Sequence, residues 1–175
     1  MKFYYGVTHI MILNMVFETI SAVFTGSNRD NTERMLIGTS VAETSLGTYP
    51  DAHPNKLGVG LMQMDRIAFE DVKARTRNAH KHTAVRRLSV DVDNVLFEEL
   101  ATCPMLSVLF ARLFYMLVPE QFPSTDEGMA DYWKEHYNTS AGEGTPEDFM
   151  NRSKALEKKL KEYGCLLGEQ ALKYA

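Results

Sequence analysis

Two short stretches, Val41–Gly47 (VAETSLG) and Gly60–Met64 (GLMQM), carry most of the structural information in this chain. The first places a carboxylic acid, Glu43, behind apolar residues that include Met35 and Leu36. This spacing indicates the last turn of a largely buried helix. Sixteen residues separate Glu43 from the second stretch, which opens with a glycine and so permits a tight backbone turn close to a ligand. The sequence therefore predicts a glutamate on a buried helix end, next to a glycine turn.

The composition is that of an ordinary globular protein. The chain has 175 residues, of which 45% are hydrophobic and 24% are charged, with a formal net charge of −4. A chain of this length is typical of one domain, so we expect residues 1–175 to form a single unit. An acidic balance gives no general argument for nucleic-acid binding, and we expect no nucleic-acid partner.

Helical spacing dominates on both sides of the two stretches, and the predicted fold is mainly α. The first core helix has its apolar positions at Ile10, Ile12, Leu13, Val16, Phe17, Ile20 and Phe24. The second follows a turn cluster and is capped by Asn31 or Thr32. Further helices are predicted over residues 65–77, 104–118, 124–137 and 145–164. Residues 47–64 are expected to form a small hairpin or an irregular loop, and residues 78–93 are ambiguous.

The N-terminal apolar stretch is interrupted by His9, Asn14 and Glu18. It therefore lacks the uninterrupted apolar block of a signal peptide and is too polar for a transmembrane segment. The histidines form no pattern typical of a metal site, because His80 and His82 are two residues apart. We expect no metal ion and no cofactor. The basic stretch 73–87 is most simply explained as a solvated helix face.

The pair Glu43-Thr44, followed after a loop by Gly60-Leu61-Met62-Gln63, resembles the core of the lytic transglycosylase and goose-type lysozyme family. The family usually has serine where this chain has Thr44. Tyr137-Asn138, with Thr139-Ser140 inserted before Ala141-Gly142, looks like the family's Tyr-Asn-Ala-Gly segment. Asn94 is the nearest match to a family asparagine. The resemblance covers roughly residues 30–145.

The resemblance implies a lysozyme-like α (α+β) domain that cleaves the MurNAc-GlcNAc β-1,4 bond of peptidoglycan, with Glu43 as general acid and base. The family's reaction uses one glutamate, which first protonates the bridging oxygen and then takes the proton of the muramoyl 6-hydroxyl. The implied substrate-binding residues are Thr44, Gly60, Leu61, Met62, Gln63, Tyr137 and Asn138. A peptidoglycan enzyme without a signal peptide would fit a bacteriophage protein. Such a protein is made in the host cytoplasm, carried in the virion or released at lysis, and acts in the periplasm or cell wall.

Two alternatives stay open. In the first, the chain is a hydrolytic lysozyme in which Asp51 or Asp65 helps to deliver water, although a turn and a helix cap explain these aspartates equally well. In the second, it is a virion structural protein that contacts other virion proteins and retains the lysozyme-like fold without activity. A helical nucleic-acid-binding module using residues 73–87 ranks last, because no aromatic platform or known motif supports it.

Overall fold

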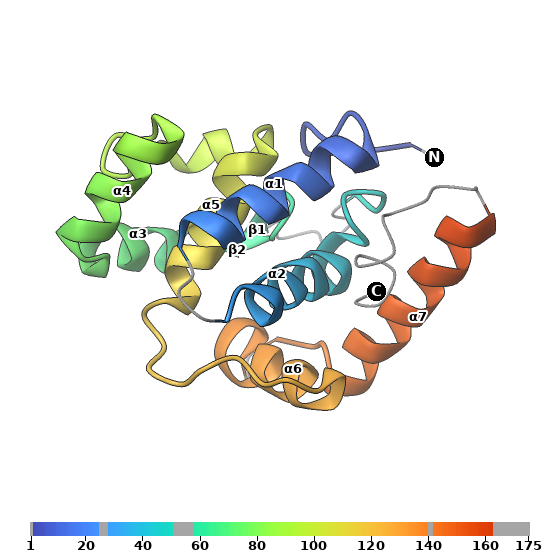
Figure 1. Cartoon of the computed structure of the whole chain (residues 1–175). Helices are drawn as coiled ribbons and strands as arrows, with labels where there is room; N and C mark the ends of the chain where they lie inside the picture. The colour runs from blue at the N-terminus through green and yellow to red at the C-terminus, as the bar shows by residue number, and fades with distance from the viewer. Residues whose placement is uncertain (1, 25–27, 51–57, 140–141, 163–175) are drawn as a thin grey trace.

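The computed structural model describes residues 2–24, 28–50, 58–139 and 142–162 (Figure 1). This part of the chain is mainly helical, with seven α-helices and one two-stranded sheet. The mainly α fold class predicted from the sequence is therefore confirmed. None of the described helices is long and apolar enough to cross a membrane.

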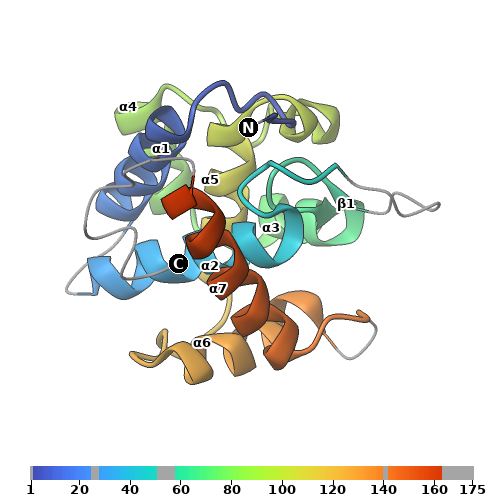
Figure 2. The same cartoon turned by 90° about the vertical axis from the view of Figure 1, so that its right-hand side faces the viewer.

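Helix α2 (Arg29–Thr44) is the central element of the fold. Eleven of its residues are buried, and they lie all around the helix. It contacts α1 (Ile10–Val23) and α5 (Pro104–Tyr115) in one part of the molecule, and α6 (Asp126–Trp133) and α7 (Pro146–Glu162) in the other. In Figure 1, α1 lies above α2 and α6 lies below it. The view in Figure 2 shows α7 crossing in front of α2.

Strands β1 (Gly58–Val59) and β2 (Met64–Asp65) form the small hairpin expected within residues 47–64. They pair antiparallel, with Gly58 opposite Asp65 and Val59 opposite Met64. The turn between them is formed by Gly60-Leu61-Met62-Gln63, which is most of the second stretch singled out in the sequence. Leu61, Met62 and Met64 are buried, and they anchor the hairpin in the core.

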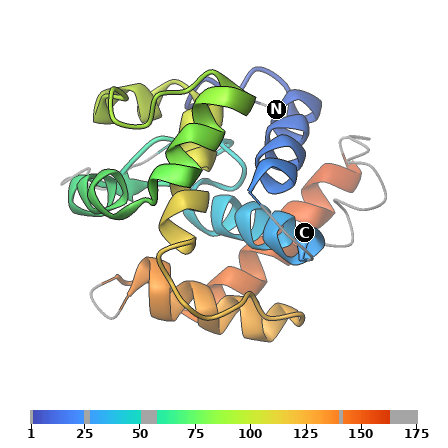
Figure 3. The same cartoon turned by 60° about the vertical axis from the view of Figure 1, so that its left-hand side comes forward.

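Helix α3 (Arg66–Arg75) follows the hairpin directly and packs against α5, and α4 (Asn78–Leu88) comes next along the chain (Figure 3). The α4 segment was ambiguous in the sequence because it is mostly polar, and only Ala84 among its residues is buried. A short 3₁₀ turn, η1 (Phe97–Ala101), leads into α5. Pro104 is the first residue of α5, as predicted.

Three helix details differ from the predictions. Helix α2 begins at Arg29, so neither Asn31 nor Thr32 caps it; Thr32 lies inside the helix and donates its hydroxyl to the Asn28 carbonyl at 2.9 Å. Helix α6 begins at Asp126 and not at residue 124, because Thr125 caps it by accepting a hydrogen bond from the amide of Gly128 at 3.1 Å. Ile12 on α1 is 55% exposed, because α1 packs against α2 and α5 through the opposite side.

After α6 the chain widens into a π-helical turn, η2 (Lys134–Asn138), which carries Tyr137 and Asn138. A predicted continuous helix through Tyr137 thus changes its hydrogen-bonding pattern after Trp133. Such single π turns are often found at functional sites. Here the turn brings Tyr137 towards the hairpin, since its hydroxyl donates to the Met62 carbonyl at 2.8 Å.

Candidate active site

Glu43 lies in the last turn of α2, as predicted, and lines a cavity of about 520 Å³. Its walls come from α2, the hairpin, the end of α6, η2, the loop that follows η2, and α7. This volume is within the range of about 300–1,000 Å³ typical of small-molecule sites. The cavity brings together three segments that are far apart in the sequence: the Glu43 helix end, the hairpin, and the Tyr137 turn.

The carboxyl group of Glu43 has an unusual protonation equilibrium. Removal from water raises its pKa from 4.5 to about 7. The Trp133 indole, which donates to Oε1 of Glu43 at 3.0 Å, and the nearby charge of Arg152 both oppose this rise. A carboxylic acid held in this way keeps its proton near neutral pH and can act as a general acid.

Thr44 lies behind the cavity and fixes the helix end to the hairpin. Its side chain is 1% exposed, and its hydroxyl donates to the Leu61 carbonyl at 2.8 Å. The same oxygen accepts a hydrogen bond from the Gly47 amide at 3.1 Å. Thr44 therefore positions Glu43 relative to the hairpin. Among the described residues, the cavity lining includes Glu43 but not Thr44.

The hairpin turn contributes one side chain to the cavity and keeps the rest in the core. Gly60 has a φ of +74°, and a Cβ there would lie 2.2 Å from the Leu100 carbonyl oxygen, so the position requires glycine. The amide of Met62 donates to the buried Ser107 hydroxyl at 3.0 Å. Gln63 lines the cavity, and its Nε2 donates to the Gly60 carbonyl at 2.8 Å. Of the turn residues, Gln63 is the one placed to meet a ligand.

Tyr137 and Asn138 both line the cavity, as the resemblance led us to expect. The hydroxyl of Tyr137 is bound to the Met62 carbonyl, and burial holds its pKa well above the usual value. Asn138 accepts a hydrogen bond from Nζ of Lys134 at 2.8 Å, and the same Nζ also donates to the Gly142 carbonyl at 2.8 Å. Tyr137 thus joins η2 to the hairpin. The side chain that hydrogen-bonds to Glu43 is that of Trp133.

Trp133, Phe149 and Arg152 line the cavity but were not predicted as site residues from the sequence. Trp133 is the chain's only tryptophan, and in the sequence it is equally consistent with an aromatic helix face shared with Tyr132 and Tyr137. Arg152, on α7, donates to the Ala42 carbonyl at the end of α2. Its positive charge lowers the pKa of Glu43. In the sequence, Arg152 lies next to a mixed-charge stretch that is typical of a solvent-exposed helix, so no nearby residue pattern predicts that it belongs to a site.

Asp51 and Asp65 are the two aspartates that the lysozyme alternative would use. Asp65 lines the cavity and caps α3, accepting the Ala68 amide at 2.7 Å, so its predicted cap role is confirmed. Asp51 lies outside the described residues.

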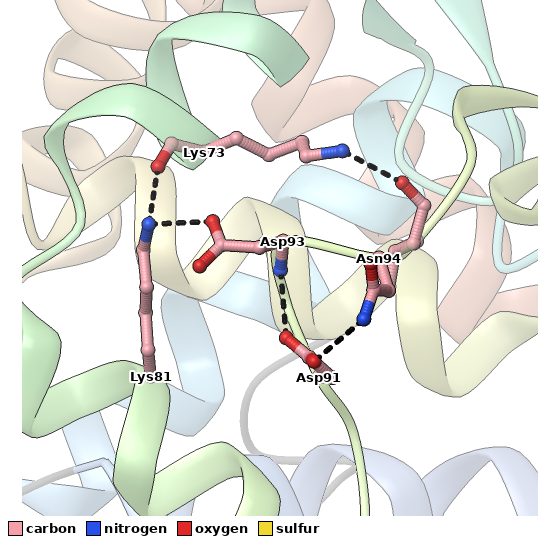
Figure 4. A network of polar contacts seen from close by, with 6 residues as sticks. Lys73, Lys81, Asp91, Asp93 and Asn94 are labelled. Atoms are coloured by element: carbon pink, nitrogen blue, oxygen red, sulfur yellow. Dashed lines mark hydrogen bonds and ion pairs between the residues drawn. The ribbon is translucent and has the colours of Figure 1, made fainter.

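Asn94, the nearest match to the family asparagine, lies in a polar network in the loop between α4 and η1 and not at the cavity (Figure 4). Its side chain donates to Asp91 at 2.7 Å. Beside it, Lys81 binds Asp93 at 2.6 Å and Lys73 donates to the Val95 carbonyl at 3.0 Å. Two lysines of the basic stretch are therefore used to hold this loop against α3 and α4.

No family model, curated protein or solved structure matches this chain. Among the described residues there is also no group of three histidine, cysteine or acidic side chains that could hold a metal ion. The side chains that line the cavity therefore define the chemistry available there. They are one acid removed from water, an indole donor, and a rim of amide, carboxylate and guanidinium groups.

Proposed function

We propose that this chain is a peptidoglycan lytic transglycosylase that cleaves the MurNAc-GlcNAc β-1,4 bond with Glu43 as general acid and base. The observation that carries the proposal is the position of Glu43 in a 520 Å³ cavity, where removal from water raises its pKa to about 7 and where Thr44 joins its helix end to the GLMQ turn. Glycosidic cleavage needs an acid that delivers a proton to the bridging oxygen as positive charge develops on the sugar. The Glu43-Thr44, GLMQ and Tyr137-Asn138 resemblance supplies the substrate class.

The same carboxyl group serves both steps of this reaction. Protonated Glu43 gives its proton to the leaving oxygen, and the resulting carboxylate then takes the proton of the muramoyl 6-hydroxyl as a 1,6-anhydro ring closes. A pKa near 7 suits this exchange, because acid and carboxylate are then close in free energy at neutral pH. The amide, carboxylate and guanidinium groups around the cavity provide hydrogen-bond partners for acetamido and sugar hydroxyl groups.

A hydrolytic lysozyme is the second candidate, and the position of Asp65 favours it. Asp65 lines the same cavity as Glu43. One of its two carboxylate oxygens accepts the hydrogen bond that caps α3, which leaves the other oxygen for a second role. In an inverting glycosidase a second carboxylate activates the attacking water. We prefer the transglycosylase because the cap already fixes one oxygen of Asp65 at the start of α3.

Digestion of purified peptidoglycan by the wild type, Glu43→Gln and Asp65→Asn, with mass spectrometry of the released muropeptides, tests the proposal. We expect products lighter than hydrolytic ones by one water, lost in Glu43→Gln and retained in Asp65→Asn. Reducing-end products lost in both variants would identify a lysozyme instead. No release by the wild type on walls of several bacterial hosts would overturn the enzymatic proposal. It would favour a virion structural role, with other virion proteins as the partners.

The place of action follows from the substrate. We propose that the protein is a bacteriophage product made in the host cytoplasm, and that it reaches peptidoglycan either as part of the virion or during lysis. Detection of the chain in purified particles by mass spectrometry would support the virion route, and its absence from them would support lysis.

A further inference from the structure

The indole of Trp133 makes the most specific contact in the cavity. Nε1 lies 3.0 Å from Oε1 of Glu43, and the tryptophan side chain is 2% exposed. An indole N–H only donates, so Oε1 must be the accepting oxygen in either protonation state. When Glu43 is protonated, its carbonyl oxygen is a better acceptor than its hydroxyl oxygen. The indole contact at Oε1 therefore favours the proton on Oε2.

The packing around Trp133 leaves the indole little freedom. Its ring lies 5.4 Å from that of Phe149, which comes from α7. A Cβ at Gly144 would lie 2.6 Å from Cη2 of Trp133, and a Cβ at Gly38 would lie 2.4 Å from Cζ of Phe149. Two glycines therefore make room for two aromatic rings, one from α6 and one from α7. The N–H is held in one direction by this packing.

We propose that Trp133 is the positioning residue of this site, and that its N–H occupies Oε1 of Glu43 so that Oε2 alone carries and delivers the proton. The use of that proton rests on the proposed function, whereas the hydrogen bond itself does not. In the acid step the Oε2–H bond breaks and the proton passes to the bridging oxygen. The electron pair of the broken O–H bond stays on Oε2 of the carboxylate. The indole hydrogen bond persists and becomes stronger, because an ionised acceptor binds a donor more tightly.

Because the chain has one tryptophan, its indole gives a single signal when the protein is labelled with ¹⁵N-tryptophan. We expect the Nε1–H resonance to move with pH, with a midpoint near the pKa of about 7 expected for Glu43. Other charged or titratable groups near the pair are Asp65 on β2, Tyr115 on α5, Tyr137 on η2, Glu143 in the following loop, and Asp148 and Arg152 on α7. The Glu43→Gln variant keeps all of them and should abolish the transition.

A second measurement isolates the N–H group. Replacing tryptophan during expression by its benzothienyl isostere changes only position 133 and exchanges the N–H for sulfur. The midpoint of Glu43, followed by its side-chain ¹³C resonance, should then rise by about one pH unit, since the bond to the charged form is lost. Tyr137→Phe is the matched control. It lines the same cavity, but its hydroxyl binds Met62, so the midpoint should not change.

The outcomes separate this inference from the proposed function. An indole signal that does not follow Glu43, or an isostere that leaves the midpoint unchanged, would overturn the role of Trp133 whether or not the protein digests peptidoglycan. A protein that shows both shifts but releases no muropeptides would keep the hydrogen-bond assignment and lose the proposed function. In an active protein the isostere should lower kcat and leave KM unchanged, because the orientation of the acid matters only when the proton moves. A rise in KM with unchanged kcat would overturn the positioning role.

Discussion

The desolvated carboxyl group of Glu43 makes the stability of the folded chain depend on pH. Its folded-state pKa is raised to about 7 from 4.5, so the folded chain holds a proton that the unfolded chain releases over this interval. Stability from this group is therefore fully present below 4.5, falls as the pH rises, and is lost above about 7. The change corresponds to about 3 kcal/mol.

The Glu43→Gln variant should remove this pH dependence. Glutamine is neutral at every pH and can still accept the Trp133 hydrogen bond through its amide oxygen. We expect urea unfolding to give similar free energies for the two proteins well below pH 4.5, and a variant more stable by up to about 3 kcal/mol well above pH 7. Asp65→Asn is the control and should keep the wild-type slope. A stability difference between wild type and Glu43→Gln that does not change with pH would contradict the raised pKa of Glu43.

At the scale of elements, the site depends on how the end of α2 is joined to the hairpin. Thr44 makes this junction through one buried hydroxyl, which donates to Leu61 and accepts from Gly47. The family resemblance places serine here, and serine offers the same hydroxyl. The departure from the family pattern therefore preserves the group that makes the connection.

Thr44→Val and Thr44→Ser form a matched pair for this junction. Valine has nearly the same shape but leaves the Leu61 carbonyl and the Gly47 amide without their partner, so we expect a loss of about 1–3 kcal/mol in the free energy of urea unfolding. Serine retains the hydroxyl and loses one buried methyl group, so its cost should be about 1 kcal/mol. If valine were no more destabilising than serine, the hydroxyl would not be what joins the two elements.

At the scale of the whole molecule, α2 connects the two parts of the fold. It contacts α1 and α5 in one part and α6 and α7 in the other. Unfolding either part would expose buried side chains of α2, so the parts should not separate. Comparison of two probes tests this: Trp133 fluorescence reports on α6, and far-UV circular dichroism reports on all helices. We expect their urea transitions to coincide at a fixed pH. A fluorescence transition at lower urea would show that α6 and α7 unfold first.

Much of this arrangement could be predicted from the sequence, because its signals are local. Apolar spacing predicted α1, α2 and α5, the proline at position 104 marked a helix start, and the glycines around residues 58–60 marked the hairpin turn. The position of Glu43 in the last turn of a buried helix also followed from spacing alone. Helix α4 was ambiguous because a mostly exposed polar helix has no apolar period to read.

The tertiary structure alone decided which groups meet Glu43. Trp133 and Arg152 lie 90 and 109 positions further along the chain, and their contacts depend on how α6 and α7 pack against α2. Spacing gives the direction of a side chain within its own element, but not the partner it meets across an interface. The raised pKa of Glu43 has the same origin, since desolvation depends on every element that closes the cavity. The sequence thus determined the acid and its helix, whereas only the packing of distant helices determined its proton affinity and its hydrogen-bond partner.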